Sequence, residues 1–106
     1  MKLIYAIVQN KDAGRLSKKF NENNVRATKL ASTGGFLSEG NTTFIIGVQD
    51  EKVDSVLELI KDCSQKRQEF VNPVVNSHAG EFTQPLEITV GGAIVFVTPV
   101  DEFKRF

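Results

Sequence analysis

Three polar side chains early in the chain, Asn24, Arg26 and Thr28, stand at every second residue. In an extended strand such residues share one face and lie roughly 6.6 Å apart, at about 3.3 Å per residue. A guanidinium donates hydrogen bonds in a planar fork that matches a phosphate, and the amide and hydroxyl add uncharged hydrogen bonds. The row therefore indicates a site for a phosphodiester.

The segment 32–40 that follows this row contains three glycines. Glycine permits positive φ, so such a loop can aim backbone N–H groups at an anion. Phe36 and Leu37 lie between these glycines, and an apolar pair within a polar loop needs something to pack on. A purine face is one candidate, because base–aromatic stacking is worth about 1–3 kcal/mol per base.

A structural explanation of the same residues stays open at this point. Phe36 can fold back onto the protein, and Arg26 can form a salt bridge on an edge strand. The pair Gly91-Gly92 within the last expected strand has two explanations as well. It indicates either the close approach of another backbone or a ligand, or a bend that helps the sheet to twist.

Groups that could perform catalysis are scarce. The single histidine, His78, lies in a polar stretch, and the single cysteine, Cys63, falls at the end of an expected helix, where a packed thiol is the ordinary outcome. Neither a zinc site nor an intramolecular disulfide fits this inventory. The sequence predicts no enzyme, no metal and no cofactor.

The elements that must position these residues follow from hydrophobic periodicity. The chain length of 106 residues suits one domain, spanning 1–106. Strands are expected at 3–8, 25–31, 42–49 and 87–98, helices at 12–23 and from 50 onward, a short edge strand at 69–75, and a polar loop at 76–85. Asn10 or Asp12 is expected to cap the first helix, and Asp50 the second. This order predicts an α+β, ferredoxin-like βαββαβ fold, with two helices on one face of an antiparallel sheet.

The last expected strand is apolar on both faces. One face carries Ile88, Val90, Ile94 and Phe96, and the other carries Ala93, Val95 and Val97. Two helices cover only one face, and burying three further aliphatic side chains is worth about 5–9 kcal/mol. We therefore expect another subunit to cover the second face, which makes the protein an oligomer.

The charge balance limits the partners. Lys plus Arg and Asp plus Glu each number 13, so no excess positive field favours general binding of DNA or RNA. The apolar run 3–8 is too short for a membrane span, so membrane insertion is not expected and the cytoplasm is the expected compartment.

The stretches 24–37 (NVRATKLASTGGFL), 40–44 (GNTTF) and 90–97 (VGGAIVFV) resemble the PII-like cyclic di-AMP receptor family, of the PstA or DarA type. The resemblance spans nearly the whole chain. It implies a PII-like homotrimer that binds one cyclic di-AMP at each of three subunit interfaces and has no enzymatic activity.

The resemblance also implies roles for individual residues. Arg26 and Thr28 would hold a phosphate, and Phe36 and Leu37 would pack on adenine. Further contacts would come from Asn24, from Asn41, from the backbone around Gly35 and Gly47, and from Gly92 of the neighbouring subunit. Ligand binding would order the surface loops and so modulate a downstream protein, which the sequence does not identify.

Two other functions fit the same architecture. A nitrogen-type PII regulator would bind ATP and 2-oxoglutarate, but it needs a long loop after the second strand, and segment 32–40 is short. An acylphosphatase-like enzyme would place a phosphate-cradling arginine in the loop before the first helix, whereas Arg15 lies beyond that loop.

Overall fold

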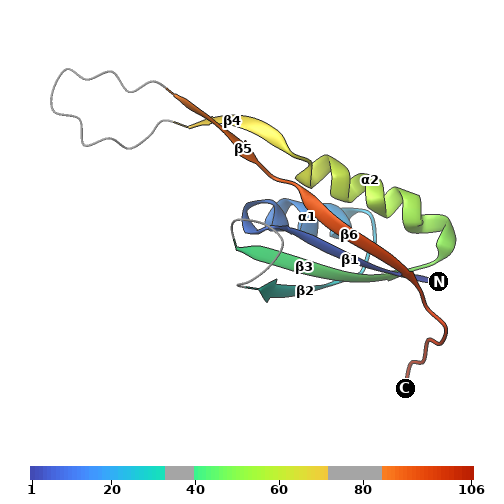
Figure 1. The fold of residues 1–106 in the computed structure, drawn as a ribbon. Coiled ribbons are helices and arrows are strands. Elements are labelled where there is room, and N and C mark those ends of the chain that lie inside the picture. Colours follow the sequence, from blue (N-terminus) through green and yellow to red (C-terminus); the bar gives the residue numbers. More distant parts are fainter. Residues whose placement is uncertain (33–39, 72–84) are drawn as a thin grey trace, which may run out of the picture.

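The structure is a computed structural model that describes residues 1–32, 40–71 and 85–106 (Figure 1). Its elements, in chain order, are β1 (Lys2–Gln9), α1 (Asn10–Glu22), β2 (Ala27–Ser32), β3 (Asn41–Val48), the 3-10 turn η1 (Asp50–Lys52), α2 (Val53–Ser64), β4 (Arg67–Val71), β5 (Leu86–Val90) and β6 (Ala93–Pro99). The expected α+β, ferredoxin-like arrangement is confirmed.

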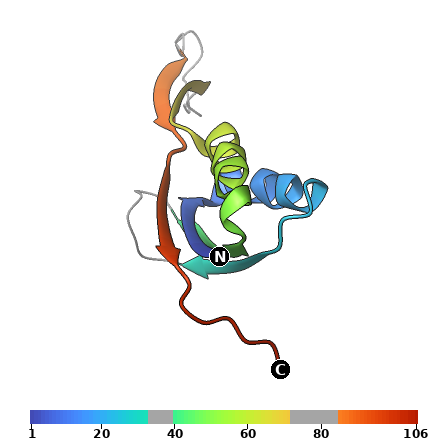
Figure 2. The same ribbon diagram turned by 90° about the vertical axis from the view of Figure 1, so that its right-hand side faces the viewer.

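Four strands form one antiparallel sheet in the order β2-β3-β1-β6, and both helices lie on one of its faces (Figure 2). Alternate residues of β1 and β3 point into the core beneath the helices, as period-two patterning requires. The helices contribute the expected stripes, and the rings of Phe20 and Phe44 meet edge to face at 5.4 Å. The largest fully buried apolar side chains are Ile4, Val8, Leu16, Phe20, Phe44, Ile46, Val56 and Ile60.

The other face of this sheet carries apolar side chains that no helix covers. Tyr5 lies opposite Ile45 on β3 and Phe96 on β6, and Ile7 lies opposite Ile94. These side chains are half-buried, except that of Phe96, which is 47% exposed. The expectation of a sheet apolar on both sides is confirmed.

The prediction of one continuous strand over 87–98 is wrong, because the structure has two separate strands there, β5 and β6. The strand breaks at Gly91 and Gly92, which have φ values of 83° and 104° that continuous β-structure does not use. Before the break, β5 pairs with β4 in a separate two-stranded sheet, which we call the ribbon. The ribbon projects from one end of the molecule, whereas the C-terminal residues leave from the other (Figure 1).

The expected helix caps are also wrong. α1 begins at Asn10 after Gln9, and α2 follows the 3-10 turn that starts at Asp50, with no side-chain cap hydrogen bond at either start. The Asp50 carboxylate instead lies 2.9 Å from the N-terminal amine, and Asp12 pairs with Arg67 of the ribbon. Both carboxylates are attracted by full positive charges, which outcompete exposed backbone N–H groups.

Two strand boundaries differ from expectation. β2 begins at Ala27 rather than at residue 25, because Asn24 has a φ of 57° and Val25 still donates a hydrogen bond to the Phe20 carbonyl. β4 covers Arg67–Val71, earlier than the expected 69–75, and the polar stretch 76–85 lies outside the described residues except for Pro85. Within the described ranges, no helix is long and apolar enough to cross a membrane.

Candidate functional site

A pocket of about 240 Å³ brings together three of the residues that the sequence singled out, Asn24, Arg26 and Gly47. Its other lining residues are Met1, Val25, Val48, Gln49 and Lys52. Arg26 and Lys52 place two cationic groups around one hollow, so the pocket suits an anion. Lys52 was not anticipated as a site residue, because in the sequence it reads only as part of a helix start.

The end of α1 fixes the entry to this pocket. The Asn23 side chain donates to the Lys19 carbonyl at 2.8 Å, and the Val25 N–H donates to the Phe20 carbonyl at 2.8 Å. With the helix end held in this way, Asn24 turns the chain through its positive φ, and Arg26 is exposed at the beginning of the β2 edge.

Gly47 has no reason within its own chain to be glycine. A Cβ added to it meets nothing within 4 Å, its φ is not in the left-handed region, and it lies exposed on β3. The glycine therefore leaves open space beside Arg26, where a molecule from outside the subunit can approach the backbone closely.

The remaining predicted residues lie elsewhere. Thr28 is exposed on β2 opposite Ile45, on the uncovered face of the sheet. Asn41 is 1% exposed at the start of β3, six residues from Gly47, and this separation is roughly 20 Å at about 3.3 Å per residue. Gly35, Phe36 and Leu37 lie outside the described residues.

Gly92 lies at the same end of the sheet as Asn41, because Val8 pairs with Ala93 and Gln9 pairs with Asn41. It is also on the opposite edge from Arg26, since β2 and β6 are the two edge strands. Three strand spacings of about 4.8 Å separate those edges. One subunit therefore cannot offer Gly92 and Arg26 to the same small molecule.

Both backbone N–H groups at the Gly91–Gly92 break are hydrogen-bonded. The Gly91 N–H donates to Gln9 Oε1 at 2.7 Å, and the Gly92 N–H donates to the Ser64 carbonyl. A Cβ on Gly91 would lie 2.7 Å from the Gln65 carbonyl oxygen and 2.6 Å from Arg67 Nη1. Glycine is thus required at position 91 by both its φ and its surroundings.

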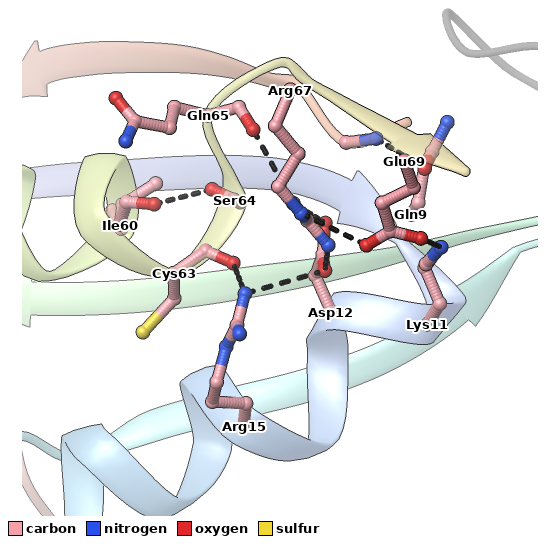
Figure 3. Close-up of polar contacts among 11 residues, drawn as sticks. Gln9, Lys11, Asp12, Arg15, Ile60, Cys63, Ser64, Gln65, Arg67 and Glu69 are labelled. Carbon is pink, nitrogen blue, oxygen red and sulfur yellow. Dashed lines mark hydrogen bonds and ion pairs between the residues drawn. The ribbon is translucent and has the colours of Figure 1, made fainter. Parts of the chain in front are cut away.

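A network of ion pairs holds the base of the ribbon against α1 (Figure 3). Arg67 lies 2.7 Å from Asp12 and 3.3 Å from Glu69, and Lys11 lies 3.0 Å from Glu69. The hydrogen bond that Arg67 donates to the Asp12 carboxylate raises the pKa of Arg67, and the hydrogen bond that Lys11 donates lowers the pKa of Glu69. Arg15 donates to the Cys63 carbonyl and so ties α1 to the end of α2. The network therefore sets where Gly92 lies.

A larger hollow of about 670 Å³ runs between α2 and β6, and we call it the α2–β6 groove. It is lined by Leu57, Glu58, Ile60, Lys61, Ser64, Gln65, Lys66, Gly92, Ala93, Ile94 and Val95. Gly92 lies at the end of this groove that adjoins the ribbon.

Groups suited to catalysis do not gather in the described ranges. Cys63 is a buried thiol, as expected, and no three His, Cys, Asp or Glu side chains of these ranges are placed to hold a metal ion. His78 lies outside the described residues. The polar side chains that line the Arg26 pocket can bind a ligand through charge and hydrogen bonds.

Comparison with known proteins decides the family. The model of the family described as "Cyclic-di-AMP receptor" matches residues 1–106. The chain belongs to the cyclic di-AMP receptor family. Its ligand is therefore cyclic di-AMP, a cyclic dinucleotide with two phosphodiester groups, which agrees with the anion pocket around Arg26.

The fold has a close counterpart among solved structures. A crystal structure of a functionally unknown protein from Pediococcus pentosaceus ATCC 25745 is 53% identical in sequence, with a TM-score of 0.83. The match covers 99% of this receptor and 96% of that chain. The match therefore extends over nearly the full length of both chains.

Proposed function

We propose that this receptor is a PII-like signal transduction protein that acts as a homotrimer and binds cyclic di-AMP between its subunits. The separation of Arg26 from Gly92 carries the proposal, because these two residues lie on opposite edges and at opposite ends of one sheet. A ligand that contacts both residues must lie between two chains. Three equivalent interfaces would then bind three ligands.

The uncovered face of the sheet supports self-association. Tyr5, Ile7, Ile45 and Ile94 are half-buried there, and Phe96 is 47% exposed. Burying an apolar side chain is worth about 1.5–3 kcal/mol, so covering this face with further copies stabilises the assembly. Packing three such faces together leaves each β2 edge next to a β6 edge.

The ligand contacts divide by chemistry. Arg26 and Thr28 bind a phosphate, Asn24 adds an amide, and Gly47 allows the ligand to approach the β3 backbone. Phe36 and Leu37 pack on adenine, with backbone groups near Gly35. Asn41 is buried, so its contribution is to hold the end of β3 that borders this loop.

The receptor signals by changing shape rather than by chemistry. Cyclic di-AMP shifts the population of the loop that contains Phe36 toward its bound conformation, and a downstream protein that recognises this conformation then binds with linked affinity. The protein acts in the cytoplasm and needs no cofactor. The family match favours this function over a nitrogen-type PII regulator and over an acylphosphatase-like enzyme.

Calorimetry with cyclic di-AMP tests the site. Arg26→Ala should weaken binding by about 1.5–3 kcal/mol, the range for a hydrogen bond to a charged group. Arg26→Lys should also bind less tightly, since an ammonium lacks the planar fork. Lys18→Ala, on the exposed face of α1, is the matched control and should bind like the wild type. An unchanged dissociation constant for Arg26→Ala would remove this residue from the site.

A further inference from the structure

The C-terminal tail, residues 101–106, carries two aromatic side chains that contact little of their own subunit. Phe103 is 61% exposed and Phe106 is fully exposed. Every residue of the tail is exposed, and its Glu102 and Lys104 side chains form an ion pair with each other at 3.5 Å. Two phenylalanines three residues apart on an extended segment are poorly suited to water, so they indicate a docking segment.

The α2–β6 groove offers a matching surface. Its floor is apolar, with Leu57 and Ile60 from α2 and Ala93 and Val95 from β6. The groove holds about 670 Å³. On β6 the groove is lined by Ala93, Ile94 and Val95 at the start of the strand, whereas the tail follows the end of the strand at Pro99. We propose that the tail of one receptor subunit docks in the α2–β6 groove of the neighbouring subunit.

The order of charges fits one direction of docking. Lys66 and Lys61 lie toward the end of the groove at Gly92, and Glu58 lies further back along α2. The tail presents Asp101 and Glu102 first, and Lys104 and Arg105 after Phe103. A tail that enters at the Gly92 end therefore sets its acidic residues beside the lysines and its basic residues beside Glu58.

The distance between the charged residues along the groove also agrees with the length of the tail. Glu58 and the last residue of α2, Ser64, are about 9 Å apart along the helix, at about 1.5 Å per residue, and Lys66 lies two residues beyond the helix end. Four steps of extended chain from Asp101 to Arg105 cover roughly 13 Å, at about 3.3 Å per residue. The acidic and basic halves of the tail thus reach their partners together, and the two aromatic side chains lie over the apolar floor.

The start of the tail lies near the pocket that contains Arg26. The Val100 N–H donates to the Met1 carbonyl at 3.2 Å, and Met1 lines that pocket. This step rests on the proposed function: where the Arg26 pocket of one subunit meets Gly92 of the next, the tail begins beside the groove entrance. Tail docking would therefore strengthen the same interface that holds the ligand.

Disulfide trapping between two different chains tests the contact. Chains with Arg105→Cys are co-expressed with chains with Glu58→Cys, both in a Cys63→Ala background, and mild oxidation is followed on denaturing gels. We expect the mixed dimer to form at least about tenfold faster than in a control in which Glu22→Cys, exposed at the end of α1, replaces Glu58→Cys. Equal rates in the two pairs would overturn the proposal.

A second measurement uses no cysteine. The double variant Phe103→Ala/Phe106→Ala should raise about tenfold the chain concentration at which half of the trimers dissociate, as measured by sedimentation. Phe70→Ala removes an aromatic side chain that is 72% exposed on the ribbon and should have no effect. An unchanged dissociation concentration for the double variant would contradict tail docking.

These outcomes separate the inference from the proposed function. A wild-type trimer that binds cyclic di-AMP but shows no selective cross-link would overturn tail docking alone. A wild type that stays monomeric would overturn the trimer and tail docking together.

Discussion

Arg67 on the ribbon and Asp12 on α1, 55 residues apart in the sequence, meet with Nη2 and Oδ1 2.7 Å apart. The Asp12 side chain is 2% exposed, and that of Arg67 is 28% exposed. The pair joins the ribbon to the four-stranded domain beside the Gly91–Gly92 break. It therefore couples the position of Gly92, a proposed ligand contact, to the start of α1.

Arg67→Met should lower the free energy of unfolding by about 3 kcal/mol, because it leaves the Asp12 carboxylate buried without its closest partner. Arg15, 3.6 Å from the same carboxylate, limits the loss. The double variant Asp12→Ala/Arg67→Met removes the buried charge and should be more stable than Arg67→Met alone. Urea denaturation measures both, and a double variant that is less stable than the single one would contradict this account of the pair.

Gly47→Ala should leave stability nearly unchanged, since a Cβ there meets nothing within 4 Å. It should weaken cyclic di-AMP binding about tenfold or more, because the methyl group occupies the space beside Arg26. Gly14→Ala is the matched control, at a glycine that also has open space but lies on α1. This control should gain about 0.5–1 kcal/mol of stability from helix propensity and bind normally. Equal affinities for the two variants would exclude Gly47 from the site.

Gly91→Ala should be strongly destabilising, in contrast to Gly47→Ala. Its φ of 83° disfavours a side chain, and the added methyl would lie 2.7 Å from the Gln65 carbonyl oxygen, which is backbone and cannot easily move. Thermal unfolding followed by circular dichroism should show a melting temperature well below that of the wild type. A melting temperature equal to the wild-type value would mean that the chain can relieve this contact.

At acid pH, the free energy of unfolding should depend on the ionisation of Glu69. Its pKa lies below the usual 4.5, chiefly because of the hydrogen bond from Lys11 and also because of Arg67. A carboxylate with a lowered folded-state pKa stabilises the fold above its unfolded pKa and loses that contribution as the pH falls through the folded value. The stability difference between the wild type and Glu69→Gln should thus be constant from pH 7 to about 5 and shrink below pH 4.5. A difference independent of pH down to pH 3 would contradict this role.

Local sequence patterns predicted most of the fold. The stripe of Leu16 and Phe20 and the alternation of Phe44 and Ile46 each define a buried face without reference to distant residues. The break at Gly91 was harder to predict. The glycine pair indicates a bend or a close approach, but the apolar residues on both sides favour one continuous strand.

The ion-pair network could not be predicted, because it depends on residues brought together by the fold. Asp12 has the sequence position of a helix cap, and only the tertiary structure reveals Arg67 beside it. In the candidate site, too, some residues could be predicted from the local sequence and others only from the tertiary structure. The residue types of Asn24 and Arg26 indicated an anion site, although Asn24, with a φ of 57°, precedes β2 and is not part of the expected strand row. Lys52 joins the pocket through the packing of the turn after β3.

Native mass spectrometry with cyclic di-AMP tests the central claim most directly, because it reports the number of chains and of ligands in one particle. We predict a particle of three 11.7 kDa chains that takes up as many as three ligands, with Arg26→Ala trimers remaining unliganded at the same concentration. Single chains that each carry a cyclic di-AMP would contradict binding between subunits.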